Sequence, residues 1–228
     1  MLLEVIATTL QDALIAEECG ADRIELITAI TEGGLTPSIG LIDRVTQRVQ
    51  IPVNVMIRPH SRTFVTDNED LETMLEDITR IQTTGAAGIV LGPLTPKGAI
   101  DESVLRQLLD AAGSLDVTYH RAFDEVSDQL AAYDVLRRYP QISRILTSGG
   151  SAPALQSIPQ IRRLVERSKQ GGPRILAGYG LTPEGIISFI EETGVDEVHF
   201  GSSIREGRTG LGLIDKPALR ALAESLHK

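Results

Sequence analysis

The chain has 228 residues, of which 42% are hydrophobic and 23% charged, with a net charge of −9 and a pI near 5.0. This is the profile of a soluble globular protein, and its acidic balance argues against nucleic-acid binding, which uses Lys and Arg to neutralise phosphates. The single cysteine, Cys19, excludes an intramolecular disulfide and fits a reducing cytosol. There is no signal-peptide pattern at the N-terminus and no apolar run near the ~20 residues that span a bilayer. We therefore expect a cytoplasmic protein that binds neither nucleic acid nor membranes.

Short apolar runs rich in Val, Ile and Leu recur along the chain and predict eight β-strands. In chain order the predicted strands are Leu2–Ala7, Arg23–Ile27, Pro52–Ile57, Gly88–Leu91, Val117–His120, Arg144–Leu146, Arg174–Ala177 and Glu197–Phe200. Apolar residues at helical spacing lie between them and predict helices. The two clearest stripes are Leu71, Met74, Leu75, Ile78 and Ile81, and Val104, Leu105, Leu108, Leu109 and Ala112. Thr36-Pro37 and Thr182-Pro183 are typical helix starts, with an N-cap before a proline.

A short internal repeat supports an alternation of helices and strands. Cys19–Leu26, Thr84–Leu91 and Thr193–Phe200 share a glycine at their second position, which is expected to end a helix in the left-handed conformation before a strand. The whole pattern predicts a single α/β domain over residues 1–228, a (β/α)₈ TIM-type barrel with parallel strands, a fold of typically ~250 residues. A doubly wound open sheet is the structural alternative, but it usually needs fewer strands.

The functional site of such a barrel lies at the C-terminal ends of its strands. The candidate catalytic residues found there are Glu25, Arg58, His120, Arg121, Asp124 and His199, with Ser148 beside them. Glu4 and Glu25 are unusual inside barrel strands, which are normally filled with branched apolar side chains. Two interpretations stay open for them: a satisfied polar layer paired with Arg58 or Arg121, or part of a functional cleft.

Glycine-rich loops follow the last two predicted strands and are candidates for anion binding through backbone N–H groups. The predicted ligand-binding residues are Gly178, Gly180, Gly201, Ser202 and Ser203, with Arg205 close in sequence. Ordinary turns are the alternative. The loop Glu32–Ser38 also carries paired glycines that allow backbone to approach a ligand. No nucleophile elbow and no His or Cys pair at metal-ligand spacing occurs, so no metal site is predicted. Cys19 is expected to be a small packed residue on the first helix.

Five ordered motifs resemble the copper homeostasis protein CutC family, over about residues 3–203. They are Ile24–Leu26 followed by Glu32–Ser38, Met56–Pro59, Val117–Asp124 and Arg144–Gly149. The resemblance implies a cytoplasmic TIM-type barrel, usually a homo-oligomer, with a role in copper homeostasis and copper as the only implied cofactor. Family members proposed to bind Cu(I) carry a cysteine in each of the first two strands, where this chain has Ile6 and Ile27. Because thiolates select Cu(I), we expect no tight Cu(I) site in this barrel.

Three functional hypotheses follow. The first is a copper homeostasis protein that acts through a weak site or a partner. The second is a barrel enzyme for a small anionic or phosphorylated metabolite, in which Arg58 and Arg121 orient the anion, His120 is the acid or base, and Glu25 is its charge partner. The third is a binding module without catalysis that uses the same cleft. The fold alone does not choose between them.

Overall fold

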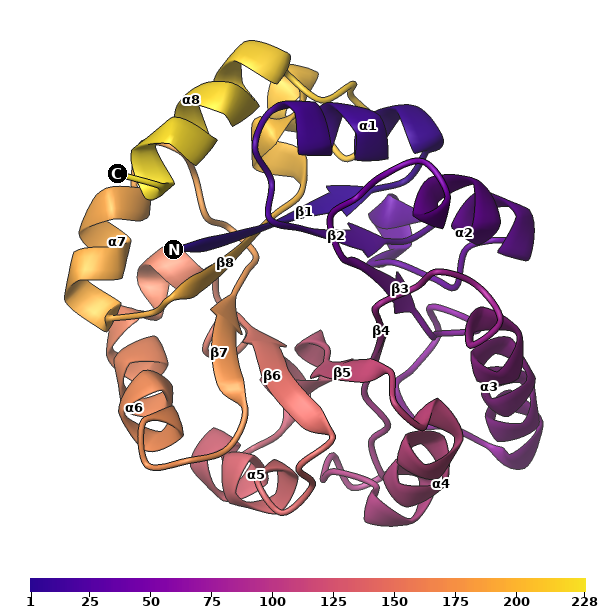
Figure 1. Ribbon diagram of the computed structural model, residues 1–228. Coiled ribbons are helices and arrows are strands. Elements are labelled where there is room, and N and C mark those ends of the chain that lie inside the picture. Colours follow the sequence, from indigo (N-terminus) through magenta and orange to yellow (C-terminus); the bar gives the residue numbers. More distant parts are fainter.

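The structure is a computed structural model that describes all 228 residues. Eight parallel strands form a closed barrel in chain order, with β8 hydrogen-bonded to β1, and eight α-helices surround it (Figure 1). The strands are β1 (Leu2–Ala7), β2 (Arg23–Leu26), β3 (Val53–Met56), β4 (Gly88–Leu91), β5 (Asp116–Tyr119), β6 (Ile142–Thr147), β7 (Arg174–Ala177) and β8 (Glu197–Phe200). The helices are α1 (Leu10–Glu18), α2 (Ile39–Thr46), α3 (Asn68–Ile81), α4 (Glu102–Ala112), α5 (Gln129–Leu136), α6 (Ile158–Ser168), α7 (Ile186–Thr193) and α8 (Lys216–Leu226).

The predicted fold class is confirmed, and every predicted strand is present within two residues of its expected ends. The predicted apolar stripes also lie on helices. All five stripe residues of α4 are buried, and Met74, Ile78 and Ile81 of α3 face inward. Helix α3 begins with a capping box between Asp67 and Asp70, which satisfies N–H groups at the helix start.

Both predicted helix starts are wrong in position. Helix α2 is capped by Ser38, because the Thr36 hydroxyl instead accepts a hydrogen bond from the Arg58 N–H at 2.9 Å. Thr182 closes a turn by accepting from the Gly185 N–H, and α7 begins only after that glycine. In both places a loop contact competes with the cap.

The glycines of the internal repeat behave differently from one another. Gly20 and Gly194 have φ values of 94° and 69°, as expected for helix ends in the left-handed region. Gly85 does not have a positive φ, so this part of the prediction is wrong. A methyl group at Gly85 would touch the side chain of Thr46, so its small size serves packing.

The main hydrophobic core lies between the outer face of the barrel and the helices. It is a cluster of 56 buried residues, to which β1 contributes Leu3, Val5 and Ala7. Because side chains alternate along a strand, Glu4 and Ile6 of the same strand point into the barrel. The apolar residues of the interior form a much smaller cluster, made of Ile27, Met56 and Val90 with Ile6 and Ile30 against it. Many of the other side chains inside the barrel are polar or charged, among them Glu4, Arg23, Glu25 and Glu197.

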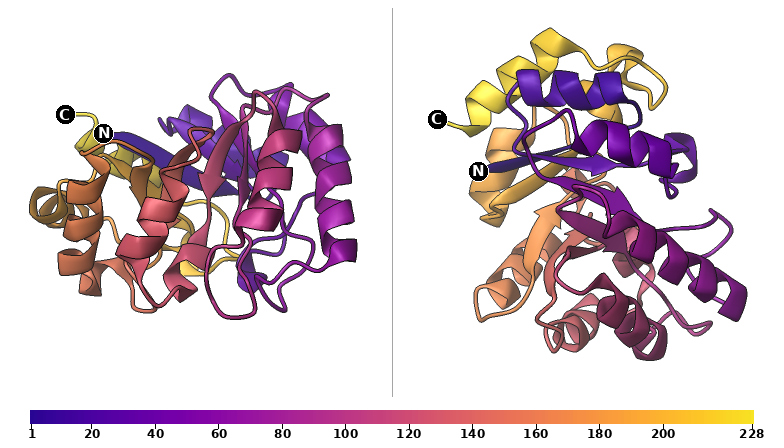
Figure 2. Two further views of the ribbon diagram at one scale, coloured as in Figure 1. Left: turned by 90° about the horizontal axis from the view of Figure 1, so that it is seen from below. Right: turned by 45° about the vertical axis from the view of Figure 1, so that its right-hand side comes forward.

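The two chain termini lie near each other at the end of the barrel where the strands begin (Figures 1 and 2). The opposite end carries the loops that follow the strands, including the short 3₁₀ turns η1 (Ile30–Glu32), η2 (Arg121–Glu125), η3 (Ala154–Gln156), η4 (Ser202–Ile204) and η5 (Glu206–Arg208). None of the helices is both long and apolar enough to cross a lipid bilayer.

Candidate functional site

A cavity of about 640 Å³ opens at the C-terminal ends of the strands. It brings together most of the residues that the sequence singled out: Glu25, Arg58, His120, Arg121, His199, Gly180, Gly201, Ser202 and Ser203. Asp124 and Gly178 do not line it. Its volume is within the range of pockets that enclose a small metabolite.

Arg58 follows β3 and is held in place by backbone carbonyls. Its Nη1 donates to the carbonyls of Glu32 at 3.1 Å and Gly34 at 3.4 Å, and Nη2 donates to the carbonyl of Ser61 at 3.3 Å. Nε has no partner, and burial lowers the pKa of the guanidinium. Gly33 and Gly34 both have positive φ values, and a methyl group on Gly33 would lie 3.2 Å from Nη1. The paired glycines thus allow this loop to wrap around Arg58.

Arg58 differs from the other buried arginines in its charge partners. Arg23 pairs with Glu4 and Glu197, Arg144 with Asp116 and Glu197, and Arg205 with Asp12. No carboxylate lies within 4.0 Å of Arg58, although the residue is only 9% exposed. The carboxylates of Glu125 and Glu32 act on its charge only from farther away. A buried positive charge without a directly paired carboxylate favours an anionic partner.

His120 follows β5 and is under the influence of the charges of Arg58 and Arg121. Its Nδ1 accepts a hydrogen bond from the Ala122 N–H at 3.2 Å, so the neutral ring carries its proton on Nε2. Burial and, after it, the charge of Arg58 lower its pKa to about 3. His120 is therefore neutral near pH 7 and can donate a hydrogen bond. The role of general acid or base that the sequence suggested for it does not match this environment.

Phe64 fills the space beside these two side chains. The guanidinium carbon of Arg58 lies 4.4 Å from the centre of the Phe64 ring, and the rings of Phe64 and His120 are 5.0 Å apart. A guanidinium on an aromatic face is stabilised electrostatically. The loop of residues 60–64 thereby packs against one wall of the cavity.

Arg121 is positioned from the opposite side by Asp124 and Tyr179. Its Nε donates to the Asp124 carboxylate at 2.8 Å, and its guanidinium carbon lies 4.0 Å from the centre of the Tyr179 ring. Asp124 also accepts from Ser148 and the hydroxyl of Thr147, which ties the β6 loop to η2. With its oxygens engaged in this way, Asp124 positions Arg121 and does not face a ligand.

The glycine loops present several backbone N–H groups without a protein partner. Those of Gly180, Leu181, Thr182 and Gly201 donate no hydrogen bond within the chain, and all four residues line the cavity. Gly178 has another role, because a methyl group there would lie 2.7 Å from Leu146 and 3.1 Å from His199. Arg205 turns away and bonds the Ile6 carbonyl and Asp12, so it does not strengthen an anion site as the sequence suggested.

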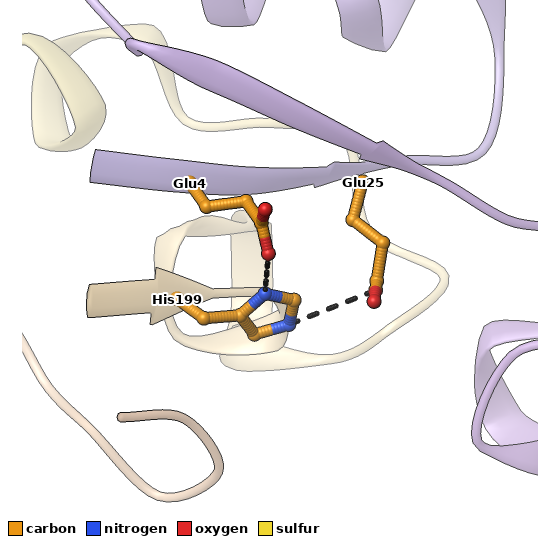
Figure 3. Close-up of side chains that lie close together, drawn as sticks. All are labelled: Glu4, Glu25 and His199. Carbon is orange, nitrogen blue, oxygen red and sulfur yellow. Dashed lines mark hydrogen bonds and ion pairs between the residues drawn. The ribbon is translucent and has the colours of Figure 1, made fainter. Parts of the chain in front are cut away.

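Glu4, His199 and Glu25 lie together within the barrel, and the last two line the cavity (Figure 3). Nδ1 of His199 lies 2.8 Å from Oε1 of Glu4, and Nε2 lies 3.8 Å from Oε2 of Glu25. Burial would raise the pKa of Glu4, but Arg23 and His199 outweigh it and lower that pKa to about 2. Because Glu4 is ionised, Nδ1 of His199 is the donor. Of the two interpretations, the polar layer paired with Arg58 or Arg121 does not form, because Glu4 pairs with Arg23 and Glu25 lies near His199 alone.

Glu25 and His199 have shifted pKa values with opposing causes. Burial raises the pKa of Glu25 to about 7, against the lowering effect of His199. Burial would lower the pKa of His199, but the carboxylates of Glu25 and Glu4 outweigh it and raise that pKa. The pair is thus the part of the site in which a proton can be exchanged near neutral pH.

The donors present do not match a Cu(I) site. Ile6 and Ile27 both line the cavity, and the thioether of Met56 is the only sulfur there. Cys19 is buried at the end of α1, with its Sγ 3.7 Å from the Lys216 carbonyl. The ligating atoms of Glu4, Glu25 and His199 lie within 4.8 Å of one another, but Glu4 is already bonded to both Arg23 and His199. Soft thiolates, which select Cu(I), are absent from this cavity.

Sequence reasoning missed several residues that shape the site. Phe64 and Tyr179 stack on the two arginines, and both come from loops without a periodic pattern. The sequence predicts no role for Arg23, although this side chain anchors Glu4. The one available signal is a charged residue inside an apolar strand run, the same signal that singles out Glu4 and Glu25.

Comparisons with known proteins agree on one family. A sequence model of the CutC family matches residues 1–204. The human copper homeostasis protein cutC homolog is 41% identical over 198 residues, which is 87% of this chain and 72% of that protein. A family protein CutC of Proteus mirabilis is 41% identical over 197 residues, 86% of this chain and 77% of that protein. The crystal structure of CutC from Streptococcus agalactiae has a TM-score of 0.83 and 35% identity, covering 87% of this chain and 97% of that one. This chain therefore belongs to the CutC family of copper homeostasis proteins.

Proposed function

We propose that this protein serves copper homeostasis, as its relatives are named, through a barrel-mouth pocket that binds a small anion instead of a Cu(I) ion. The observation that carries the proposal is Arg58, the buried arginine that has no carboxylate within 4.0 Å and that lines the cavity. A bound phosphate or carboxylate would supply a directly paired negative charge.

Other groups around the cavity suit the same ligand. His120 is neutral and offers a proton on Nε2, so it can donate to an anion without adding a charge. Arg121 keeps part of its guanidinium toward the cavity after bonding Asp124. The free N–H groups of Gly180 and Gly201 add neutral donors, as in the phosphate sites of many barrels.

Thermal unfolding with and without inorganic phosphate tests the proposal. At a phosphate concentration one hundred times the dissociation constant, the folded state should gain about 2.7 kcal/mol. Arg58→Met keeps the bulk of the side chain and removes its charge, so it should remove most of this gain. Arg80→Ala, on the exposed face of α3, should retain it. If phosphate and simple carboxylates leave the unfolding of the parent protein unchanged, the pocket does not bind small anions.

An enzyme for a small anionic or phosphorylated metabolite is the second candidate function. It is favoured by the Glu25 and His199 side chains, which line the same cavity as Arg58. A pocket for binding alone has no need of two proton-exchanging groups in its wall. We also propose a cytoplasmic location, supported by the single, unbridged cysteine, and a homo-oligomeric state, supported only by the family resemblance.

A further inference from the structure

Glu25 is the one buried carboxylate in the barrel interior that has no hydrogen bond. Glu4 on β1 and Glu197 on β8, the other buried glutamates of the interior, are both bonded to Arg23. Glu25 is 2% exposed, its Oε1 has no partner, and its nearest polar contact is Nε2 of His199 at 3.8 Å. A buried carboxyl group without a hydrogen-bond partner destabilises the fold. Glu25 takes no part in the ion pairs of Glu4, Arg23 and Glu197, so these ion pairs do not explain why a glutamate is present at this position.

A second unpartnered side chain lies beside Glu25. Asn54 pairs with it in the register between β2 and β3, is 1% exposed, and has no hydrogen-bond partner for either its Nδ2 or its Oδ1. Three buried polar atoms on adjacent strands thus lack partners inside the chain. Glu25 lines the cavity together with His199, and Asn54 lies beside Glu25 on the next strand, which marks a place for polar groups of a ligand.

His199 is oriented toward the same place by Glu4. The ionised Glu4 carboxylate accepts from Nδ1, which leaves Nε2 directed at Glu25, as Figure 3 shows. Glu4 itself is fixed by Arg23. A carboxylate that holds one imidazole nitrogen while the other meets the ligand is the usual arrangement of a histidine that transfers protons.

We propose that Glu25 and His199 are catalytic residues that move protons between adjacent carbons of a small α-hydroxycarbonyl phosphate. This proposal rests on the proposed function, because Arg58 and the free N–H groups would hold the phosphate of that substrate. The class follows from two sets of groups that line the cavity: a cation for the anionic group, and a base paired with an acid for a carbon acid.

The chemistry balances without a further reagent. The Glu25 carboxylate takes the proton from the carbon next to the carbonyl, and the C–H electron pair forms the C=C bond of an enediol. The carbonyl π pair moves to oxygen, which takes the Nε2 proton of the imidazolium form of His199. Return of the proton from Glu25 to the neighbouring carbon, and of a hydroxyl proton to His199, gives the isomer and restores both residues.

Deuterium exchange tests the proposal. The protein is incubated in D₂O with dihydroxyacetone phosphate, erythrulose 4-phosphate, ribulose 5-phosphate and fructose 6-phosphate in turn, and ¹H NMR follows the protons next to the carbonyl. At least one compound should lose these signals faster than without protein. Glu25→Gln should lower that rate by about 10²- to 10⁴-fold, the usual contribution of general acid–base catalysis. Glu166→Gln, the same change on the exposed face of α6, should leave the rate unchanged.

The outcomes separate this inference from the proposed function. Stabilisation by phosphate in Glu25→Gln, measured by thermal unfolding, shows that the variant is folded and the anion site intact. If phosphate stabilises the parent protein and none of the four compounds exchanges, the catalytic proposal fails while anion binding stands. Exchange at the parent rate in both Glu25→Gln and His199→Gln would also overturn it. If phosphate does not stabilise the parent protein, the proposed function itself fails.

Discussion

Nδ1 of His199 lies 2.8 Å from Oε1 of Glu4, and this contact determines which ring nitrogen is available at the cavity. Glu4 also binds Arg23, which bridges to Glu197. The orientation of His199 is thus set by a buried ionic network of side chains from β1, β2 and β8. Glu25 stands outside this network and shares only the free Nε2 with it.

The pH dependence of stability should report on Glu25. Burial raises its pKa from 4.5 to about 7, so the folded state prefers the protonated carboxyl. Its contribution is complete below pH 4.5 and is lost as the pH rises through 7, which lowers the free energy of unfolding by about 3 kcal/mol. The Glu25→Gln variant has no carboxyl group at this position, so its free energy of unfolding does not fall in this way. Denaturant titrations should therefore show the variant gaining on the parent protein between pH 4.5 and 7.

The control for this measurement is again Glu166→Gln, whose difference from the parent should not change over the same pH range. A Glu25→Gln difference that is constant with pH would mean that Glu25 is ionised in the folded state at pH 5, and that its burial is compensated by a partner.

His120 should stay uncharged over the physiological range. Burial, and next to it the charge of Arg58, hold its pKa near 3, and Nδ1 accepts from the Ala122 N–H. In ¹⁵N NMR of the imidazole groups, His120 should be the Nε2–H tautomer from pH 5 to 8. A His120 signal that titrates near pH 6 would contradict the assignment of a neutral donor.

The barrel was predictable because eight apolar runs and two clear helical stripes carry a strong periodic signal. The position of the site was predictable too, because polar residues such as Arg58 and His120 follow strands, and parallel strands end at one rim. The pairing of individual charged side chains inside the barrel was not predictable. Arg23 reaches Glu4 because β1 and β2 pair in that register, and the sequence does not encode the register locally.

The two histidines show the same limit at the level of chemistry. His120 and His199 both lie at strand ends, and burial acts to lower the pKa of each. Beside His120 the charge of Arg58 lowers it further, whereas Glu25 and Glu4 outweigh burial at His199 and raise its pKa. Phe64 comes from a loop whose path depends on the packing of Arg58. The Thr36 hydroxyl could cap α2, but it accepts a hydrogen bond from the N–H of Arg58 at the end of β3. Ser38 therefore caps the helix instead.

Gly92 should be intolerant of any side chain. A methyl group there would lie 2.4 Å from Nδ1 of His120, so Gly92→Ala must displace the imidazole or the strand. We expect a loss of about 1–3 kcal/mol in unfolding free energy, as for overpacked cores, and a weaker response to phosphate. Gly40→Ala on α2 meets no atom within 4 Å and should be neutral or stabilising by up to about 1 kcal/mol. Chemical denaturation of both variants measures the difference, and equal stability would show that His120 is not tightly packed.

Copper binding by this chain should be weak, and the reason can be tested by adding the missing ligands. Ile6 and Ile27 line the cavity where some family members carry cysteines, and neither side chain can coordinate a metal. Titration under reducing conditions against a Cu(I) chelator should show no tight site in the parent protein and no effect of Cys19→Ser, because Cys19 is buried away from the cavity.

The double variant Ile6→Cys, Ile27→Cys should gain Cu(I) binding, since it places two thiolates in the same cavity. Ile42→Cys, buried on α2 outside the cavity, controls for the effect of an added thiol. Tight, stoichiometric binding in the parent protein that disappears with Cys19→Ser would show that copper is held at α1, and would remove the physical basis for excluding Cu(I) from this member of the family.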